Sequence, residues 1–461
     1  MTQYKSSIFI FRRDFRLIDN LGLIKLSQLS DSIIPIFIFT PTQIDDNSYK
    51  SNNCIQFMIE SLDDLSLDIQ KNNGKLYYFY GHPDIIIKNL ITKSNLNIDC
   101  VAVNMDYTPY SIQRDDKIKN ICNLYNVDFL SFEDILLNPV KSILTGADNV
   151  YQKFTPYFRA ASKIKINNPI KKKFNNFYNH SINLEYRNNI HDFYVPNDLI
   201  AVHGGRRNAL KILKNIKNFK NYNSSRNFLN LNTTKLSAYI KFGCVSIREV
   251  YHTFLKKLGS NNDLIKQLYW RDFYYNIAFE FPYVFNKNSN LKEQYNNIKW
   301  LSNTKLFNKW KNGQTGFPVV DAAMTELNTT GFMHNRGRLI VSNFLIKLLG
   351  INWEKGEHYF ATQLVDYDPC VNNGNWQWSA GSGADSQPYF RTFNPWTQLE
   401  KFDKNCLYIK KWLPQFSDIP PIDILNWDNS FHKYDIDYPK PIIDYKLQRS
   451  KIIDLYKQYL N

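Results

Sequence analysis

The stretch GFMHNRGRLIVSNFLIKLLGINWEKGEHYFATQLVDYDPCVNNGNWQWSAGSGADSQPYFRTFNPWTQ, residues 331–398, mixes residue types that usually separate in a folded chain. It holds basic residues in a predicted helix start, two closely spaced aspartates, a pair of adjacent asparagines and several tryptophans. Core helices carry fewer polar groups, and surface helices carry fewer large aromatic rings. We therefore expect the rest of the chain to be organised around this stretch.

Within it, Asp368 and Pro369 predict a helix start, because Asp caps free backbone N–H groups and Pro suits the first helical position. Asn372 and Trp376 are four residues apart and share one face of this helix. Trp378 lies roughly 200° around the axis from Trp376, at 3.6 residues per turn. The helix can therefore offer Asn and Trp to one neighbour and a second Trp to another, although a plain cap with two core tryptophans fits equally well.

A second helix is predicted to begin at residues 334–339, HNRGRL, with Asn335, Arg336 and Arg338 in its first turn. A basic helix start close to Asp366 and Asp368 fits two interpretations. One is a structural ion pair, and the other is a cradle for a cofactor with anionic and hydrogen-bonding edges. Composition does not decide between them.

Residues 230–243, NLNTTKLSAYIKFG, place Thr233, Thr234 and Ser237 near a predicted helix N-terminus. Hydroxyls and free N–H groups at such a position bind phosphate, but an ordinary helix cap has the same pattern. The chain has no Walker loop and no H-E-x-x-H motif, and its eight histidines are scattered, so we expect no catalytic metal.

The formal charge of +15 and pI near 9.2 favour a polyanionic partner such as nucleic acid, although a compositional bias towards Lys, Asn and Ile would also raise the pI. The six cysteines are far apart and form no C-x-x-C motif, as expected for reduced thiols. With neither a secretory signal nor a membrane-spanning run, we expect a soluble intracellular protein, in cytoplasm or nucleus.

Residues 1–130 alternate short apolar runs with helical periodicity. The pattern predicts buried strands at 7–11, 33–39, 75–80, 100–104 and 127–130, and helices at 20–29, 53–69, 83–90 and 110–124. This alternation predicts a parallel sheet with helices on both faces, a Rossmann-like α/β domain. The first predicted strand is followed by RRDFR and not by G-x-G-x-x-G, so we do not expect a nicotinamide dehydrogenase.

Helical periodicity dominates from about residue 204 onward. We therefore predict three parts: the α/β domain at 1–130, an interdomain connector at 131–203 and a larger all-α domain at 204–461.

Six stretches of this sequence resemble the photolyase/cryptochrome flavoprotein family over nearly the whole chain. They are FIFRRDFRLIDN, TTKLSAYIKFG, QLYWRDFYYNIAF, TGFPVVDAAMTELNTTGFMHNRGRL, DYDPCVNNGNWQWSAGSGADSQPYFRTFNP and DYPKPIIDYK. Within the family the chain looks most like class I cyclobutane pyrimidine dimer photolyases. The resemblance implies an antenna-type N-terminal domain, a helical domain that binds FAD, and light-driven repair of pyrimidine dimers by electron transfer from the reduced anionic flavin. Monomeric protein and DNA with UV lesions are the implied partners.

The resemblance also implies roles for individual residues in flavin binding and electron transfer. Positions that match flavin contacts are Tyr222, Thr233, Thr234, Ser237, Asn335, Arg338, Asp366, Asp368 and Asn372, the last of which would face flavin N5. Positions that match the family's electron-transfer tryptophans are Trp376, Trp353 and Trp300.

For DNA, the matching positions are Trp270 and Trp378 around the extruded lesion, Gln267 and Leu339 beside it, and Arg226, Arg336 and Arg391 near the phosphate backbone. Two departures matter. Gln267 stands where class I dimer photolyases have Glu, and Leu339 stands where Met is common. Gln at the first position is typical of (6-4) photolyases and animal cryptochromes. However, the histidines that (6-4) repair needs are absent, because Asn335 and Leu339 occupy their places. A (6-4) photolyase and a cryptochrome-type photoreceptor remain the alternatives.

An antenna chromophore would bind near residues 106–116, DYTPYSIQRDD. The Asn-Glu pair of folate-binding members is absent there, and Tyr110 and Ser111 stand nearby. The resemblance leaves the chromophore open between a deazaflavin, a flavin, a folate and none.

Overall fold

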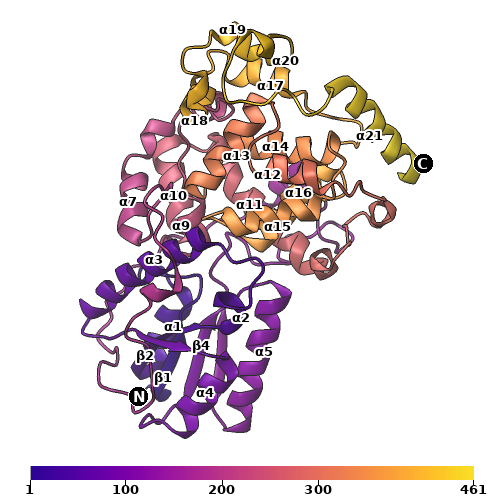
Figure 1. Cartoon of the computed structure of the whole chain (residues 1–461). Coiled ribbons are helices and arrows are strands. Elements are labelled where there is room, and N and C mark those ends of the chain that lie inside the picture. Colours follow the sequence, from indigo (N-terminus) through magenta and orange to yellow (C-terminus); the bar gives the residue numbers. More distant parts are fainter. Residues whose placement is uncertain (1, 461) are drawn as a thin grey trace.

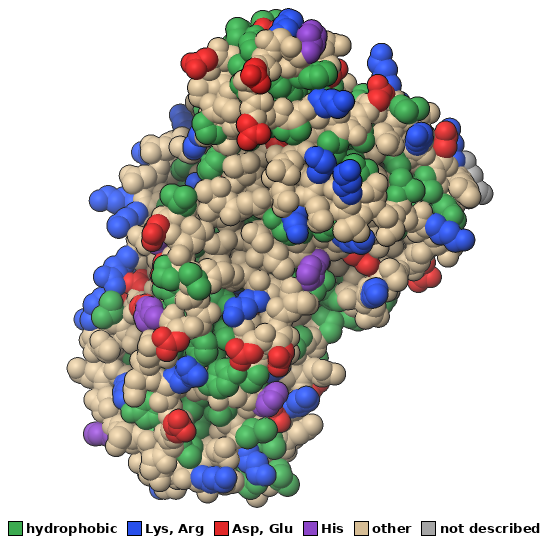
Figure 2. Space-filling model, in the orientation of Figure 1, with side chains coloured by type: hydrophobic (Ala, Val, Ile, Leu, Met, Phe, Trp, Pro, Cys, Tyr) green, Lys and Arg blue, Asp and Glu red, His purple; other side chains and the backbone are tan. Residues whose placement is uncertain are grey.

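The computed structural model describes residues 2–460, which form an α/β part and a helical part stacked end to end (Figure 1). The helix α21 (Tyr445–Leu460) lies at the edge of the helical part, away from the α/β part. In the same view, Lys and Arg side chains are spread over both parts and are not gathered in one patch (Figure 2). The net charge alone therefore does not mark a binding surface on this face.

The α/β part is built on one parallel five-stranded sheet, as predicted, with strand order β3-β2-β1-β4-β5. Its strands are β1 (Tyr4–Ile10), β2 (Ser30–Phe39), β3 (Tyr77–Tyr80), β4 (Cys100–Asn104) and β5 (Asp128–Phe132). Its helices are α1 (Leu21–Leu29), α2 (Pro41–Ile44), α3 (Asn52–Gln70), α4 (Pro83–Thr92) and α5 (Pro109–Leu124). The predicted strands and helices are confirmed, with ends that move by one to three residues.

The order of the strands reverses between β1 and β4. The chain winds from β1 through β2 to β3 on one side, and then adds β4 and β5 on the other side of β1. In open parallel sheets, ligands bind in the crevice outside the carboxyl ends of the strands at such a point. The segments that follow β1 and β4 are therefore placed to form a binding site.

Residues 131–203 return to the α/β part and do not only link the two parts. Phe177 pairs with Ile33 in an isolated parallel bridge beside β2, and Phe174 is buried next to it. This segment also contains α6 (Phe154–Ala161) and the short helix η1 (His191–Phe193). The domain limits themselves stay a prediction.

The helical part is confirmed as the larger of the two. Its α-helices are α7 (Arg206–Lys214), α8 (Tyr222–Ser225), α9 (Ser237–Lys241), α10 (Ile247–Leu258), α11 (Asp263–Glu280), α12 (Thr304–Lys311), α13 (Pro318–Thr330), α14 (Asn335–Lys347), α15 (Trp353–Gln363), α16 (Pro369–Ala380), α17 (Pro395–Phe402), α18 (Leu407–Trp412), α19 (Pro421–Leu425), α20 (Trp427–Ser430) and α21. Its short 3-10 helices are η2 (Ile216–Phe219), η3 (Pro282–Phe285), η4 (Glu293–Asn297), η5 (Pro414–Phe416) and η6 (Phe431–Lys433).

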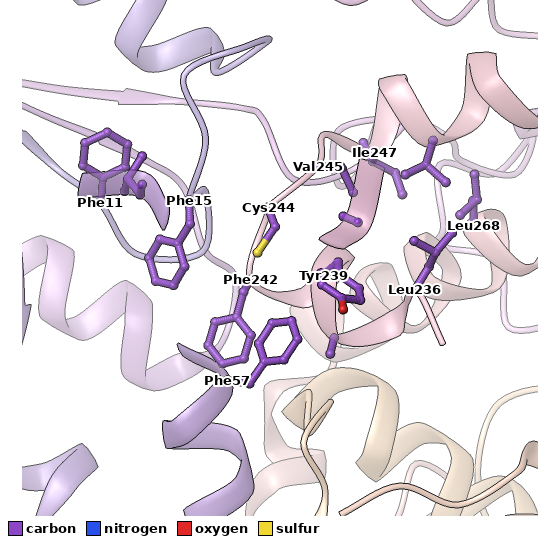
Figure 3. Close-up of a cluster of buried hydrophobic side chains, with 14 of the residues drawn as sticks. Phe11, Phe15, Phe57, Leu236, Tyr239, Phe242, Cys244, Val245, Ile247 and Leu268 are labelled. Atoms are coloured by element: carbon purple, nitrogen blue, oxygen red, sulfur yellow. The ribbon is translucent and has the colours of Figure 1, made fainter. Parts of the chain in front are cut away.

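One aromatic cluster joins the two parts (Figure 3). Phe242, just after α9, stacks on Phe15 of the α/β part at 5.8 Å and on Phe57 of α3 at 5.4 Å between ring centroids. The next residue, Gly243, has φ +63°, and a Cβ there would lie 2.2 Å from the carbonyl oxygen of Arg13. The backbones of the two parts therefore touch where no side chain fits.

We expect Gly243→Ala to lower the free energy of unfolding by about 2–5 kcal/mol, because a left-handed backbone and an overpacked contact both add cost. Gly259 is a matched control, because its φ is +87° and nothing lies within 4 Å of a Cβ built on it. Gly259→Ala should cost only the roughly 1–2 kcal/mol of the left-handed backbone. Urea unfolding curves measure both variants, and equal losses would contradict a close-packed interface.

Candidate functional site

Helix α16 carries the predicted Asn372, Trp376 and Trp378, and begins where the sequence predicted. The side chain of Asp368 accepts hydrogen bonds from the backbone N–H groups of the first turn. Trp376 is 3% exposed, whereas Trp378 is half-buried. The prediction that the two indoles serve different surroundings is confirmed.

Two glycines let the neighbouring helices come close to α16. A Cβ on Gly356 of α15 would lie 2.2 Å from the Trp376 ring, and one on Gly374 would lie 2.2 Å from the ring of Tyr274 in α11. Helix α16 is therefore held against α11 and α15 by ring-to-backbone contacts. Trp270 precedes Tyr274 by one turn of α11, and Trp378 follows Gly374 by one turn of α16, so both tryptophans lie one turn from this crossing.

Asp368 is a buried carboxylate held by cations and a phenol. It pairs with Arg13, which follows β1, and it accepts a hydrogen bond of 2.7 Å from the hydroxyl of Tyr275. Burial opposes its ionisation, but the charges of Arg13 and Arg271 outweigh burial and hold the pKa of Asp368 below its ordinary value. Arg13 and Tyr275 were not predicted as part of the site, although RRDFR stood out directly after the first strand.

Asn372 is 9% exposed and is oriented by Glu357 of α15. Its Nδ2 donates to Glu357 Oε1 at 2.8 Å and to the Glu357 carbonyl oxygen at 3.1 Å. Its Oδ1 accepts no side-chain or backbone hydrogen bond from residues 2–460. Burial raises the pKa of Glu357 to about 7, against the hydrogen bonds from Asn372 and Tyr49. Glu357 was missed because only the packing of α15 on α16 brings it to Asn372.

This shift has a direct consequence for stability. Because folding raises the pKa of Glu357 above its ordinary value of 4.5, the unfolded chain releases this proton first as pH rises. The folded state is therefore favoured most below about pH 4.5, and that advantage is lost as pH rises to about 7. One pKa unit corresponds to about 1.4 kcal/mol, so the loss is up to about 3 kcal/mol.

Glu357→Gln should remove that part of the pH dependence. The measurement is the free energy of unfolding from urea titrations at several pH values between 4.5 and 8, for the wild type and the variant. Glu354→Gln, a change on the same helix, is the control. The same decline in the wild type and in Glu357→Gln would contradict the raised pKa.

A second cluster joins three of the residues predicted around the flavin. Ser237 Oγ donates to Asp366 Oδ2 at 2.6 Å, and Arg338 Nη2 lies 3.1 and 3.0 Å from the two oxygens of Asp366. These residues come from α9, α14 and the loop before α16, so the ion pair that the sequence left open is present. Asn335, the first residue of α14, is exposed.

The predicted hydroxyl cluster is only partly at a helix start. Helix α9 begins at Ser237, and Thr233 and Thr234 precede it. Lys235 between them has φ +51°, a left-handed conformation that keeps the helix from starting earlier. Thr234 Oγ1 accepts a long hydrogen bond of 3.4 Å from the Leu236 backbone, and Tyr222 in α8 is half-buried.

The three predicted electron-transfer tryptophans lie in or against one hydrophobic core. Trp376 contacts Phe360 at 5.0 Å and Trp310 at 6.3 Å between ring centroids. Trp353 is buried, and its Nε1 donates to Asn290 Oδ1 at 3.0 Å. Trp300 is half-buried. Trp310 was not predicted, although it is a fully buried indole beside Trp376.

The residues predicted around the lesion are all partly accessible. Gln267, Trp270, Leu339 and Trp378 are half-buried. Phe154 of α6 stacks on Trp270 with ring centroids 3.7 Å apart and planes 8° apart, which fixes the orientation of this indole. Sequence reasoning missed Phe154, because it lies in the segment that was predicted to be a connector.

Two of the three predicted phosphate contacts have partners of their own. Arg336 donates to Asn227 and lies over the Phe402 ring at 4.4 Å. Arg226 lies 3.7 Å from Asp263 and is more exposed. Arg391 is exposed. Within residues 2–460, no group of three or more His, Cys, Asp or Glu side chains is arranged to hold a metal ion.

Two sequence families match this chain. The family described as FAD binding domain of DNA photolyase matches residues 264–458, and the family described as DNA photolyase matches residues 7–173. The deoxyribodipyrimidine photo-lyase of Buchnera aphidicola is 34% identical over 98% of this chain and 97% of its own length. The Escherichia coli enzyme of that name is 30% identical over 97% of each.

Solved structures give the same result. An archaeal photolyase from Sulfolobus tokodaii, solved with two FAD molecules, has a TM-score of 0.86 and 36% identity over 98% of this chain and all of its own. A class III photolyase from Agrobacterium tumefaciens has a TM-score of 0.91 and 29% identity, over 100% of this chain and 98% of its own. A cryptochrome from Synechocystis has a TM-score of 0.89 and 25% identity, over 99% of both.

Proposed function

The chain belongs to the DNA photolyase family, and on this premise we propose that it repairs cyclobutane pyrimidine dimers in DNA with light and reduced FAD. The observation that carries the proposal is the two-sided character of α16. One side places the buried amide of Asn372, and another places the half-exposed indole of Trp378. A single helix thus connects a flavin contact with a base contact.

The residues present fit FAD. The Asn372 amide nitrogen is engaged by Glu357, which leaves its oxygen as an acceptor for an N–H group such as that at N5 of a reduced flavin. The Asp366 carboxylate is fixed by Arg338 and Ser237, as suits hydrogen bonding to a flavin. When bound and reduced, FAD supplies on illumination the electron that opens the cyclobutane ring, and takes it back afterwards.

The chain's own residues would hold the lesion. The half-buried faces of Trp270 and Trp378 suit stacking with two extruded pyrimidines, and Phe154 keeps Trp270 in one orientation. The amide of Gln267 can donate to a carbonyl and accept from an N–H of the bases. Arg226, Arg336 and Arg391 would bind backbone phosphates and give the sequence-independent part of the affinity.

The site favours dimer splitting over (6-4) repair, because it lacks a general acid at the lesion. Asn335 and Leu339 do not titrate. The nearest histidine in sequence, His334, is buried, and its Nδ1 accepts a hydrogen bond of 3.1 Å from the Arg336 backbone. Burial lowers the pKa of His334 to about 4, so it is neutral at physiological pH. Splitting of the dimer breaks two carbon–carbon bonds and consumes no net proton or electron.

The test uses oligonucleotides that carry either a dimer or a (6-4) lesion, incubated with the reduced protein under blue light or in darkness. We expect light-dependent repair of the dimer alone. Repair of only the (6-4) lesion would replace the proposal with that activity. Flavin photochemistry without repair of either lesion would favour the photoreceptor function of the cryptochromes.

We expect Trp378→Ala to weaken binding of dimer-containing DNA roughly tenfold, because stacking of a base on an aromatic ring contributes about 1–3 kcal/mol. FAD content should not change, since Trp378 lies on a different side of α16 from Asn372. Trp412→Ala, at the end of α18, is the control for loss of a half-buried indole elsewhere. Fluorescence anisotropy measures binding, and loss of flavin from the Trp378 variant would show that this residue supports the cofactor.

A further inference from the structure

A cavity of about 500 Å³ lies between the sheet and the helical part. Arg12 follows β1 and Asp106 follows β4, so both line it at the point where the strand order reverses. The helical part contributes Lys241 and Tyr367. The volume is within the range of roughly 300–1,000 Å³ that small-molecule sites occupy. The cavity lies at the edge of the sheet where ligands of parallel folds bind.

The charged residues that line the cavity are unbalanced. Five are basic and one is acidic, in the order Arg12, Arg13, Lys50, Asp106, Arg114 and Lys241. The one carboxylate, Asp106, is already paired with Arg13 at 3.2 Å. Burial, together with Arg13, lowers the pKa of Lys241. The cavity therefore attracts a ligand with negative charge.

Arg12 and Arg114 form an arginine cluster on one carboxylate. Arg12 Nη1 lies 2.7 Å from Asp115, and Arg114 Nε lies 3.0 Å from the same side chain. The side chains of the two arginines are only 10% and 12% exposed. The Nη2 atom of each is buried and has no hydrogen-bond partner within residues 2–460. Two buried donors without partners are costly unless a ligand satisfies them.

The donors are of the kind that binds phosphate. Guanidinium groups present planar N–H pairs that match the oxygens of a phosphate, and the hydrogen bonds are charge-assisted. Burial and repulsion from Arg114 lower the pKa of Arg12 to about 10, so both groups stay charged at neutral pH. A ligand anion would relieve that repulsion.

The rest of the lining suits a flat aromatic ring. Its aromatic members come from both parts of the chain and are Phe11, Phe37, Phe39, Tyr49, Tyr110, Phe242, Phe285 and Tyr367. Such rings stack with planar heterocycles. The cavity thus combines an apolar, aromatic portion with a basic one.

We propose that this cavity binds a planar aromatic ligand that carries a phosphate, of the flavin nucleotide class, with the phosphate on Arg12 and Arg114. This site is separate from the one around Asn372. An unphosphorylated flavin or deazaflavin would leave the two Nη2 atoms without partners. The proposal goes beyond dimer repair, because binding here needs neither light nor damaged DNA.

The experiment titrates the purified holoprotein in the dark with FMN or riboflavin, which differ only in the phosphate. Quenching of the fluorescence of the added flavin measures binding. We expect FMN to bind roughly tenfold more tightly or better, the scale of losing charge-assisted hydrogen bonds. Inorganic phosphate should compete with FMN. Equal affinity for the two flavins, or binding of neither, would overturn the proposal.

Variants locate the effect. Arg12→Gln and Arg114→Gln should each reduce the preference for FMN severalfold, while riboflavin binding changes little. Lys117→Gln removes the same charge from an exposed position of α5 and should leave the preference unchanged. The absorbance of the FAD already bound confirms that the variants fold. A preference for FMN that survives both arginine variants would also contradict the proposal. Repair of dimers is not measured, so its failure is a separate result.

Discussion

The ion pair between Arg13 and Asp368 connects the sheet to the helix that carries the site. Arg13 follows the central strand, and Asp368 caps α16, 355 positions later in the chain. Removing one partner would leave an uncompensated buried charge, and this cost ties the position of α16 to that of the sheet. Asn372, Trp376 and Trp378 are spaced along α16, so their positions depend on the same pair. A ligand at the edge of the sheet and one beside α16 therefore share a common frame.

Two carboxylates near α16 show how surroundings set charge. Asp368 is buried among arginines and stays ionised, whereas Glu357 is buried beside neutral donors and holds its proton to about pH 7. One keeps a fixed charge at the start of the helix. The other orients an amide without adding a full charge at low pH. The same chemical group thus anchors the helix at one place and orients Asn372 at another.

The sequence predicted what depends on local pattern. Strands, helices and the cap at Asp368 follow from hydrophobic period and helix-start chemistry, and a family resemblance supplied the positions around Asp366 and Asn372. What it missed depends on contacts between distant segments. Glu357 reaches Asn372 only when α15 packs on α16, and Phe154 reaches Trp270 only when the segment before residue 204 folds back. Thr233 and Thr234 were placed too close to a helix start, because the left-handed backbone of Lys235 leaves no signal in the sequence.

The aromatic cluster around Phe242 has a consequence for how the two parts move. Phe242 lies between Phe15 and Phe57, and Gly243 lies against the backbone of Arg13. A hinge rotation would have to separate close-packed rings and open a backbone contact with no room to slide. The two parts consequently act as one rigid ruler. The distance and angle between the edge of the sheet and α16 are constants of the fold, as coupling between two light-absorbing groups requires.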